Sequence, residues 1–211
     1  MSFNIQFSKK DERLILVSLT TSPSRLLKLK KVINSIKKQT LLPSKIILNL
    51  PDKFGRTNEE YLIPEWIEND NFIYINRCSE DYGPITKIFP TLFLSNNPET
   101  MIISIDDDIE YSNKLVEEFV KHSLCYDVVF STSNFNFIKN GIIDSSRRHF
   151  GYYNIVEGYG GIIYKRKFFQ NDFFDYFNYI KKNRDCFFSD DLIISNYLSM
   201  KRIGKVFVMR L

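Results

Sequence analysis

Three consecutive carboxylates, Asp106, Asp107 and Asp108, are the residues of this chain whose type and spacing best suit chemistry. They directly follow the apolar run 101–105, which favours a buried strand. In open α/β sheets, ligands bind at the carboxyl ends of strands. Adjacent carboxylates repel each other, so a cation or hydrogen-bond donors must offset their charge. The triplet therefore predicts a site that holds a positive group.

The spacing within the triplet indicates which carboxylates act together. Alternate residues of an extended segment point the same way, so we expect Asp106 and Asp108 to face one site and Asp107 to point elsewhere. Carboxylate oxygens suit Mg²⁺ or Mn²⁺, which would also bind the oxygens of a nucleotide diphosphate. The alternative is that these acids cap the next helix or belong to a turn. Because Ser112 is available as that cap, metal binding is the favoured interpretation.

The segment Asp81-Tyr82-Gly83-Pro84-Ile-Thr-Lys87 is the second candidate. Gly83 lets the backbone turn or approach a ligand closely, and Pro84 suits the start of a helix. Lys87 would lie one turn in, where its amine could reach a phosphate near the helix N-terminus. The alternative is an ordinary junction between a loop and a helix, with a lysine on the surface.

Two further motifs lie in the second half of the chain. Asp190 and Asp191 follow Ser189 at the expected start of a helix, where the helix dipole favours acidic residues, but one of them could equally act as a general base. The residues leave both interpretations open. Glu157-Gly158-Tyr159-Gly160-Gly161 lacks the spacing of a phosphate-binding loop. It predicts either a bulged entry into a strand or a platform for a sugar acceptor.

Apolar runs and helical spacings predict the elements that hold these motifs. The order favours an α/β fold: one Rossmann-like domain over 1–211, with a mainly parallel sheet, helices on both faces and a mixed β rear portion. Residues from about 12 to 108 would form the nucleotide-binding half and 109–211 the acceptor and catalytic half. Expected strands are 14–19, 45–50, 72–75, 101–105, 127–131, 160–164 and 206–208, with a hairpin at Asn140-Gly141. Expected helices in the first half are an amphipathic one through Leu26 to Ile36, a short one near Glu59 and Tyr61, and one from Pro84 toward Leu94 with a kink at Pro90. In the second half we expect a helix capped by Ser112. We also expect a helix from Ser189 to about Met200, which ends at Gly204.

Composition excludes several classes of function. The net charge of +4 forms no dense basic stripe, which argues against nucleic-acid binding. The three cysteines, His122 and His149 show no metal-binding spacing, and no serine or cysteine lies in a nucleophile motif. With no apolar run near the roughly 20 residues of a membrane span and no signal-peptide pattern, we expect a cytoplasmic protein without an integral membrane segment.

Taken in order, these motifs resemble those of GT-A-fold glycosyltransferases, and are similar to the family-2 group. The resemblance implies a GT-A-like domain, a nucleotide-sugar donor with UDP favoured over GDP, a carbohydrate or glycoconjugate acceptor, and Mn²⁺ or Mg²⁺. Asp106 and Asp108 look like the DxD motif, with Asp108 the favoured direct ligand of the metal. The other implied roles are donor binding by Thr20, Thr21, Arg25, Asp52, Asp81, Tyr82, Gly83, Lys87 and Asp107, acceptor binding by Glu157 to Gly161, and a catalytic base at Asp190 or Asp191.

The implied reaction is attack of an acceptor hydroxyl on the anomeric carbon, with inversion and release of a nucleoside diphosphate. Two features depart from the family pattern: no histidine follows His149 as a late metal ligand, and the chain stops soon after Val208. A nucleotidyltransferase is one rival, although the segment from Thr20 to Arg25 is a poor match to its glycine-rich basic loop. A catalytically degenerate protein that binds sugar nucleotides is the other.

Overall fold

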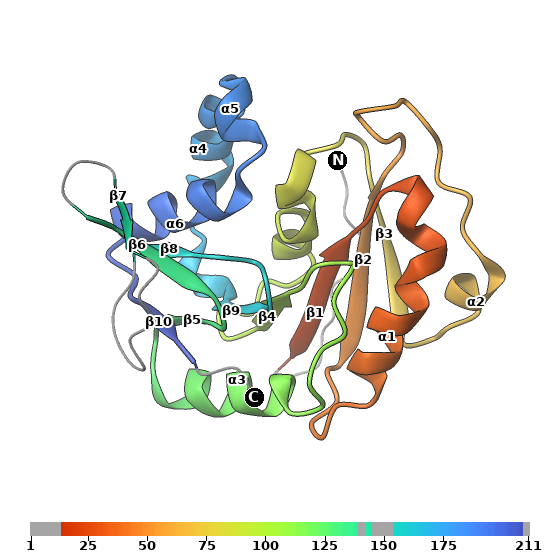
Figure 1. Ribbon diagram of the computed structural model, residues 1–211, viewed down its shortest axis with the longest axis horizontal. Coiled ribbons are helices and arrows are strands. Elements are labelled where there is room, and N and C mark those ends of the chain that lie inside the picture. Colours follow the sequence, from red (N-terminus) through yellow and green to blue (C-terminus); the bar gives the residue numbers. More distant parts are fainter. Residues whose placement is uncertain (1–13, 139–141, 145–153, 209–211) are drawn as a thin grey trace.

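Seven strands form the central sheet of the computed structural model, which describes residues 14–138, 142–144 and 154–208 (Figure 1). Their order across the sheet is β10-β5-β9-β4-β1-β2-β3. Neighbours pair in parallel except for β9, which runs antiparallel to both β4 and β5. This confirms the mainly parallel α/β sheet. The strands are β1 (Ile15–Thr20), β2 (Lys45–Pro51), β3 (Ile73–Cys78), β4 (Met101–Ser104), β5 (Val129–Ser131), β9 (Ile162–Lys165) and β10 (Lys205–Phe207).

A smaller antiparallel sheet of three strands forms the mixed β portion. Its order is β7-β6-β8, with β6 at Asn134–Ile138, β7 at Ile142–Asp144 and β8 at Ile155–Val156. The pairing of β6 with β7 agrees with the expected hairpin. The predicted turn residues Asn140 and Gly141 lie outside the described residues, as does His149.

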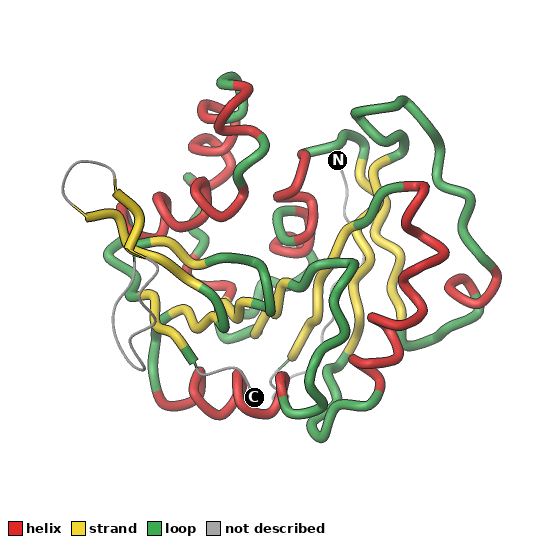
Figure 2. The backbone as a smooth tube through the Cα atoms, viewed as in Figure 1, coloured by secondary structure: helices red, strands yellow, loops and turns green. Residues whose placement is uncertain are grey.

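Helices cover both faces of the central sheet (Figure 2). Alternate strand residues divide between two cores: Ile103 packs with one set of helices and Ile102 with the other. The first set comprises η1 (Pro23–Lys28), α1 (Leu29–Lys37), α2 (Glu65–Glu68) and α3 (Leu115–Cys125). The second comprises η2 (Gly83–Lys87), η3 (Pro90–Phe93), η4 (Arg166–Phe168), α4 (Phe173–Ile180) and α6 (Asp190–Met200), and α5 (Arg184–Phe187) precedes α6.

Helix ends differ most from the predictions. Ser112 does not cap α3, whose N-cap is Lys114; the Ser112 hydroxyl instead accepts the Lys114 N–H in the preceding turn. Ser189 does occupy the N-cap of α6, but its hydroxyl makes no capping hydrogen bond. Beyond α6 the left-handed residue is Arg202, with φ 57°, and not Gly204.

Two short helices also lie elsewhere than expected. The helix predicted near Glu59 and Tyr61 is α2, a few residues later. The helix predicted from Pro84 is two 3₁₀ segments, and Pro90 begins the second because it has no N–H to continue the first. Within the described part of the chain, none of the helices has the length and apolarity to span a membrane.

A buried polar network fastens η2 and η3 to the sheet. Asn49 on β2 donates to the Ser18 and Thr91 hydroxyls at 3.0 and 2.9 Å, and accepts a hydrogen bond from the Asn76 amide at 2.7 Å. The Ser18 hydroxyl in turn donates to the Lys87 carbonyl at 2.5 Å. Buried polar groups are costly unless paired, so this network fixes where η2 lies on the sheet.

The network predicts a large loss of stability in Asn49→Ala. The substitution removes the shared partner of three buried groups, so we expect a loss of about 2 to 4 kcal/mol in the free energy of unfolding. Urea unfolding measures it. Asn34→Ala on the exposed face of α1 is the control and should change stability by less than about 0.5 kcal/mol. A loss below about 1 kcal/mol for Asn49→Ala would contradict the role of the network.

Candidate functional site

A cavity of about 630 Å³ opens at the carboxyl ends of β1 and β4. Most of the predicted donor residues line it, so the structure brings together segments that are up to 90 residues apart in sequence. Those residues are Thr20, Thr21, Arg25, Asp81, Gly83, Lys87, Asp106 and Asp107. Its wall also contains Phe54, Gly55, Arg56, Thr57, Tyr61, Phe187 and Phe188, which sequence reasoning did not single out.

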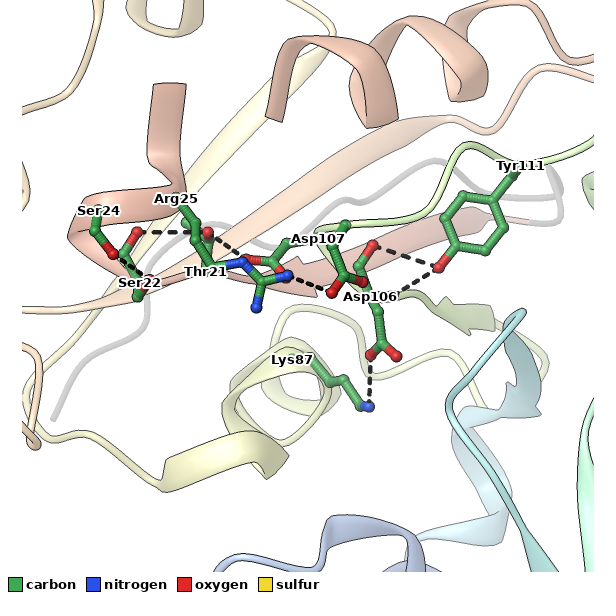
Figure 3. Close-up of polar contacts among 9 residues, drawn as sticks. Thr21, Ser22, Ser24, Arg25, Lys87, Asp106, Asp107 and Tyr111 are labelled. Carbon is green, nitrogen blue, oxygen red and sulfur yellow. Dashed lines mark hydrogen bonds and ion pairs between the residues drawn. The ribbon is translucent and has the colours of Figure 1, made fainter. Parts of the chain in front are cut away.

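Arg25 compensates two of the three consecutive carboxylates (Figure 3). A single guanidinium nitrogen, Nη2, lies 2.8 Å from Asp107 Oδ1 and 2.5 Å from Asp108 Oδ2. Thr21 also donates its hydroxyl to Asp107 Oδ2 at 2.5 Å. Burial raises the pKa of Asp107, although the Thr21 hydrogen bond and the Arg25 charge oppose that shift. Asp107 and Asp108 therefore share one cation, which contradicts the expectation that Asp106 and Asp108 would be the pair.

Asp106 points toward a different cation. Its Oδ1 lies 2.9 Å from Lys87 Nζ, and Figure 3 shows the lysine approaching it from η2. The Asp106 N–H donates to the Tyr111 hydroxyl at 2.8 Å, and that hydroxyl donates to the Asp106 carbonyl at 3.3 Å. The triplet therefore divides because the chain has left the strand: β4 ends at Ser104, and the alternation of an extended segment no longer applies.

Lys87 joins the triplet to the first turn of α6. Its Nζ also lies 2.9 Å from Asp190 Oδ2, so the amine forms ion pairs with both Asp106 and Asp190. Burial lowers the pKa of Lys87, but the charges of Asp190, Asp106 and Asp191 outweigh it and hold the pKa well above its usual value. Lys87 was expected to reach a phosphate; in the structure it binds carboxylates.

Asp191 has the electrostatic environment of a proton acceptor. Its Oδ1 accepts the Gly158 N–H at 2.9 Å. Burial, together with the nearby Asp190 charge, raises the pKa of Asp191 to about 7. A general base is most effective when its pKa lies near the working pH. The structure thus distinguishes two residues that the sequence left equivalent, because Asp190 is in an ion pair with Lys87.

The loop of Asp81 closes one side of the cavity. Asp81 accepts N–H groups from Gly55 at 2.7 Å and from Gly83 at 2.8 Å. Gly83 has φ 72° and lies against the Phe187 ring, where a side chain would collide. This conformation and close contact both require glycine.

Two predicted donor residues lie away from the cavity wall. Tyr82 packs in the second core, with its ring centroid 4.9 Å from that of Phe89. Asp52 is exposed beyond β2, and its backbone N–H donates a hydrogen bond to the Cys78 carbonyl. The structure therefore does not bring these two side chains to the other candidate residues.

The loop before β9 places its backbone beside the catalytic candidates. Gly160 and Gly161 have φ values of 88° and 103°, which bend the chain into the strand as the glycine pattern predicted. Glu157 accepts the Ser133 hydroxyl at 2.7 Å, and Tyr159 is exposed. Tyr159 and Gly160 line a second hollow, of about 290 Å³.

Aromatic residues that sequence reasoning missed also close the donor cavity. The guanidinium of Arg56 lies 5.2 Å from the centre of the Phe188 ring, which joins the loop after β2 to the start of α6. The Tyr61 hydroxyl donates to the Thr21 carbonyl at 2.9 Å. These contacts link distant segments, so no local motif marks them.

The carboxylates of the acidic loop are the candidate ligands of a divalent metal ion. Asp107 and Asp108 already approach one cationic atom, Arg25 Nη2, and the Asp108 side chain is 59% exposed. A metal ion at that position would require Arg25 to move. Among residues 14–138, 142–144 and 154–208, no cluster of three or more acidic, histidine or cysteine side chains is gathered to hold a metal. The oxygens of a bound ligand or water would have to complete the coordination.

Comparison with solved structures finds the same fold in proteins of low sequence identity. The 1–349 segment of TarS from S. aureus aligns with a TM-score of 0.55 and 14% identity, over 93% of this chain and 60% of that one. GalNAc-T7, solved with UDP, GalNAc and Mn²⁺, aligns with a TM-score of 0.61 and 12% identity, over 95% and 43% of the two chains. A cytidylyltransferase for 2-C-methyl-D-erythritol 4-phosphate from Francisella tularensis gives 0.54 and 11%, over 93% and 89%.

The first two of these proteins are GT-A-like glycosyltransferases and the third is a nucleotidyltransferase. The TarS segment has also been solved with UDP. The chain spans about three-fifths or less of the lengths of the two glycosyltransferase chains. No family model and no curated protein sequence matches it. These likenesses confirm a single, mainly parallel α/β domain with the GT-A-like, Rossmann-like fold of these neighbours.

The raised pKa of Asp191 predicts a pH-dependent stability. An aspartate in an unfolded chain has a pKa of about 3.9, so the folded state binds this proton more tightly and loses stability as the pH rises from about 4 to 7. Asp191→Asn removes that titration. We expect it to be more stable than wild type by roughly 2 to 4 kcal/mol at pH 8 and nearly equal at pH 4. Urea unfolding across this range measures the difference, and a difference that did not grow between pH 4 and pH 8 would contradict the raised pKa of Asp191.

The Arg25 ion pairs predict competition between Arg25 and a metal ion. Arg25→Ala removes the cation that bridges Asp107 and Asp108, so we expect roughly three- to tenfold tighter binding of Mn²⁺ in the absence of nucleotide. Electron paramagnetic resonance of free Mn²⁺ measures the affinity. Asp108→Ala is the matched variant and should weaken binding. Equal Mn²⁺ affinities in all three proteins would contradict a metal site at this loop.

Proposed function

We propose that this protein is a metal-dependent glycosyltransferase that moves a sugar from a nucleotide-diphosphate donor to an acceptor hydroxyl. The observation that carries the proposal is the position of Asp191. Its carboxylate has a pKa raised to about 7 and lies one residue from Asp190, which Lys87 connects to the acidic loop of the donor cavity. Transfer to a hydroxyl requires a proton acceptor near the donor, and the ion pair of Asp190 with Lys87 connects the start of α6 to the cavity wall.

The donor would occupy the cavity at the carboxyl ends of β1 and β4. Thr20, Thr21 and Arg25 line one side and the Asp81 loop the other. Arg25 offers a guanidinium that suits phosphate oxygens, and it is 39% exposed. UDP is favoured over GDP, and the structures of TarS with UDP and of GalNAc-T7 with UDP and Mn²⁺ support that choice at the level of fold.

Asp108 would hold the metal ion together with a second carboxylate. The sequence predicts Asp106 as that second ligand, and the geometry favours Asp107. Bound there, Mn²⁺ or Mg²⁺ would neutralise the charge that builds on the departing diphosphate. Hard oxygen ligands and the exposed Asp108 carboxylate fit such an ion. Arg25 would leave the two carboxylates and remain close to the donor's phosphates.

Asp191 would act as the base. An acceptor hydroxyl forms a bond to the anomeric carbon while its proton passes to Asp191. The bond from that carbon to the phosphate oxygen breaks, and the nucleoside diphosphate leaves with the electron pair. Displacement in a single step inverts the anomeric centre. Tyr159 and the glycines beside it would border a carbohydrate or glycoconjugate acceptor, since the Gly158 N–H contacts Asp191 and the next residue, Tyr159, is exposed.

Two asparagine substitutions test the assignment of the base. We expect Asp191→Asn to lower kcat by roughly 10²- to 10⁴-fold with UDP affinity nearly unchanged. Asp190→Asn should lower kcat far less and should also lower the melting temperature, because Lys87 loses a partner. Thermal shift with a panel of nucleotide sugars and Mn²⁺ identifies the donor, and release of the nucleoside diphosphate then measures turnover. Small and equal losses in the two variants would indicate that both acids only stabilise the start of α6.

The same assay separates the rival functions. A glycosyltransferase releases a nucleoside diphosphate, whereas a nucleotidyltransferase releases pyrophosphate from a nucleoside triphosphate. The rival has structural support, because the cytidylyltransferase aligns over 89% of its own length. Release of pyrophosphate from a nucleoside triphosphate by the wild-type protein would show that it is a nucleotidyltransferase. Donor binding without transfer or hydrolysis would instead indicate a degenerate binding protein.

A further inference from the structure

Lys87 is the buried cation at the centre of the site. The residue is only 8% exposed, and its amine lies 2.9 Å from both Asp106 Oδ1 and Asp190 Oδ2. Asp190 is equally buried. These two carboxylates belong to different segments, the loop after β4 and the first turn of α6. One ammonium group therefore links the two halves of the site.

The sheet fixes the base of this side chain. The Lys87 carbonyl accepts the Ser18 hydroxyl from β1 at 2.5 Å and the Asn49 amide from β2 at 3.4 Å. Both donors belong to the buried polar network, so hydrogen bonds from the sheet hold the Lys87 backbone. Ion pairs with Asp106 and Asp190 hold its amine. A side chain fixed at both ends has little freedom to follow an incoming ligand.

Gly158 lies directly against the Lys87 amine, where only a residue without a side chain fits. A Cβ atom added at Gly158 would collide with Lys87 Nζ and would lie 3.4 Å from Asp191 Oδ1. The Gly158 N–H donates to that same oxygen at 2.9 Å. The glycine therefore touches both the lysine and the candidate base, and its lack of a side chain is what allows the three groups to meet.

We propose that Lys87 is a positioning residue that ties the acidic loop to the start of α6 and commits Asp190 to a structural ion pair, leaving Asp191 as the base. This inference rests on the proposed function. It assigns Lys87 a role other than binding the donor's phosphate, which was the role expected from its sequence context. It also explains why two adjacent acids at one helix start act differently.

A double-mutant cycle in thermal unfolding tests the link without any nucleotide. Lys87→Met leaves the buried Asp190 and the partly exposed Asp106 without their shared cation, so we expect the melting temperature to fall by roughly 10 °C. In Lys87→Met/Asp190→Asn one of those charges is gone, and at least half of the loss should be recovered. Lys37→Met, which removes an ion pair with Asp70 at the surface, is the control and should shift the melting temperature by no more than about 2 °C. Additive effects in the cycle would overturn the proposal.

Binding and turnover separate positioning from phosphate binding. With Mn²⁺ present, we expect Lys87→Met to bind UDP within about fivefold of wild type, while kcat falls roughly 100-fold and KM changes little. A loss of UDP affinity beyond about 30-fold would make Lys87 a donor ligand and overturn the proposal. If the wild-type protein bound no UDP at all, the proposed function would fail, and the unfolding cycle would still decide whether Lys87 couples the two segments.

Discussion

The compensation of negative charge is the constraint on which this site depends. Five carboxylates, from Asp106 to Asp108 and at Asp190 and Asp191, converge at one edge of the sheet, where burial strengthens their repulsion. Two cationic side chains compensate these negative charges. Arg25 pairs with Asp107 and Asp108, and Lys87 with Asp106 and Asp190. Asp191 is the acid that neither ion pair includes, and burial, together with the neighbouring Asp190 charge, raises its pKa.

The topology of the sheet explains why these groups meet. Parallel strands bring the loops after β1 and β4 to the same edge, which places Arg25 next to the acidic loop. Strand β9 runs antiparallel to β4, so the loop that enters β9 lies where β4 ends. That reversal brings Gly158 to the Asp106 loop, and α6 then supplies its first turn from the other side. A sheet that was parallel throughout would have placed the glycine loop at the opposite edge.

Much of this arrangement could be predicted from the sequence, because it depends on local patterns. Apolar runs located the strands, and the glycines before β9 predicted a bend into the strand, where Gly160 and Gly161 have positive φ. The wrong predictions concern orientation. Asp106 and Asp108 were paired on the assumption of an extended chain, but β4 ends before them. Helix α4 was missed even though Phe173, Phe177 and Ile180 have helical spacing. The contact of Arg56 with Phe188 joins residues too far apart in sequence for any local motif to mark.

The two cations differ in burial, and burial determines what each can do when a ligand arrives. Arg25 is 39% exposed on the wall of the cavity, so water can replace its ion pair with the exposed Asp108 at little cost, whereas Asp107 is buried and keeps the Thr21 hydrogen bond. Lys87 is 8% exposed and held at both ends, and moving it would leave the buried Asp190 without its cation. The site therefore combines an exposed cation on the cavity wall with a buried one between Asp106 and Asp190. Under the proposed function, a donor would therefore rearrange Asp107 and Asp108, the partners of Arg25, while Lys87 would keep Asp106 and Asp190 in place.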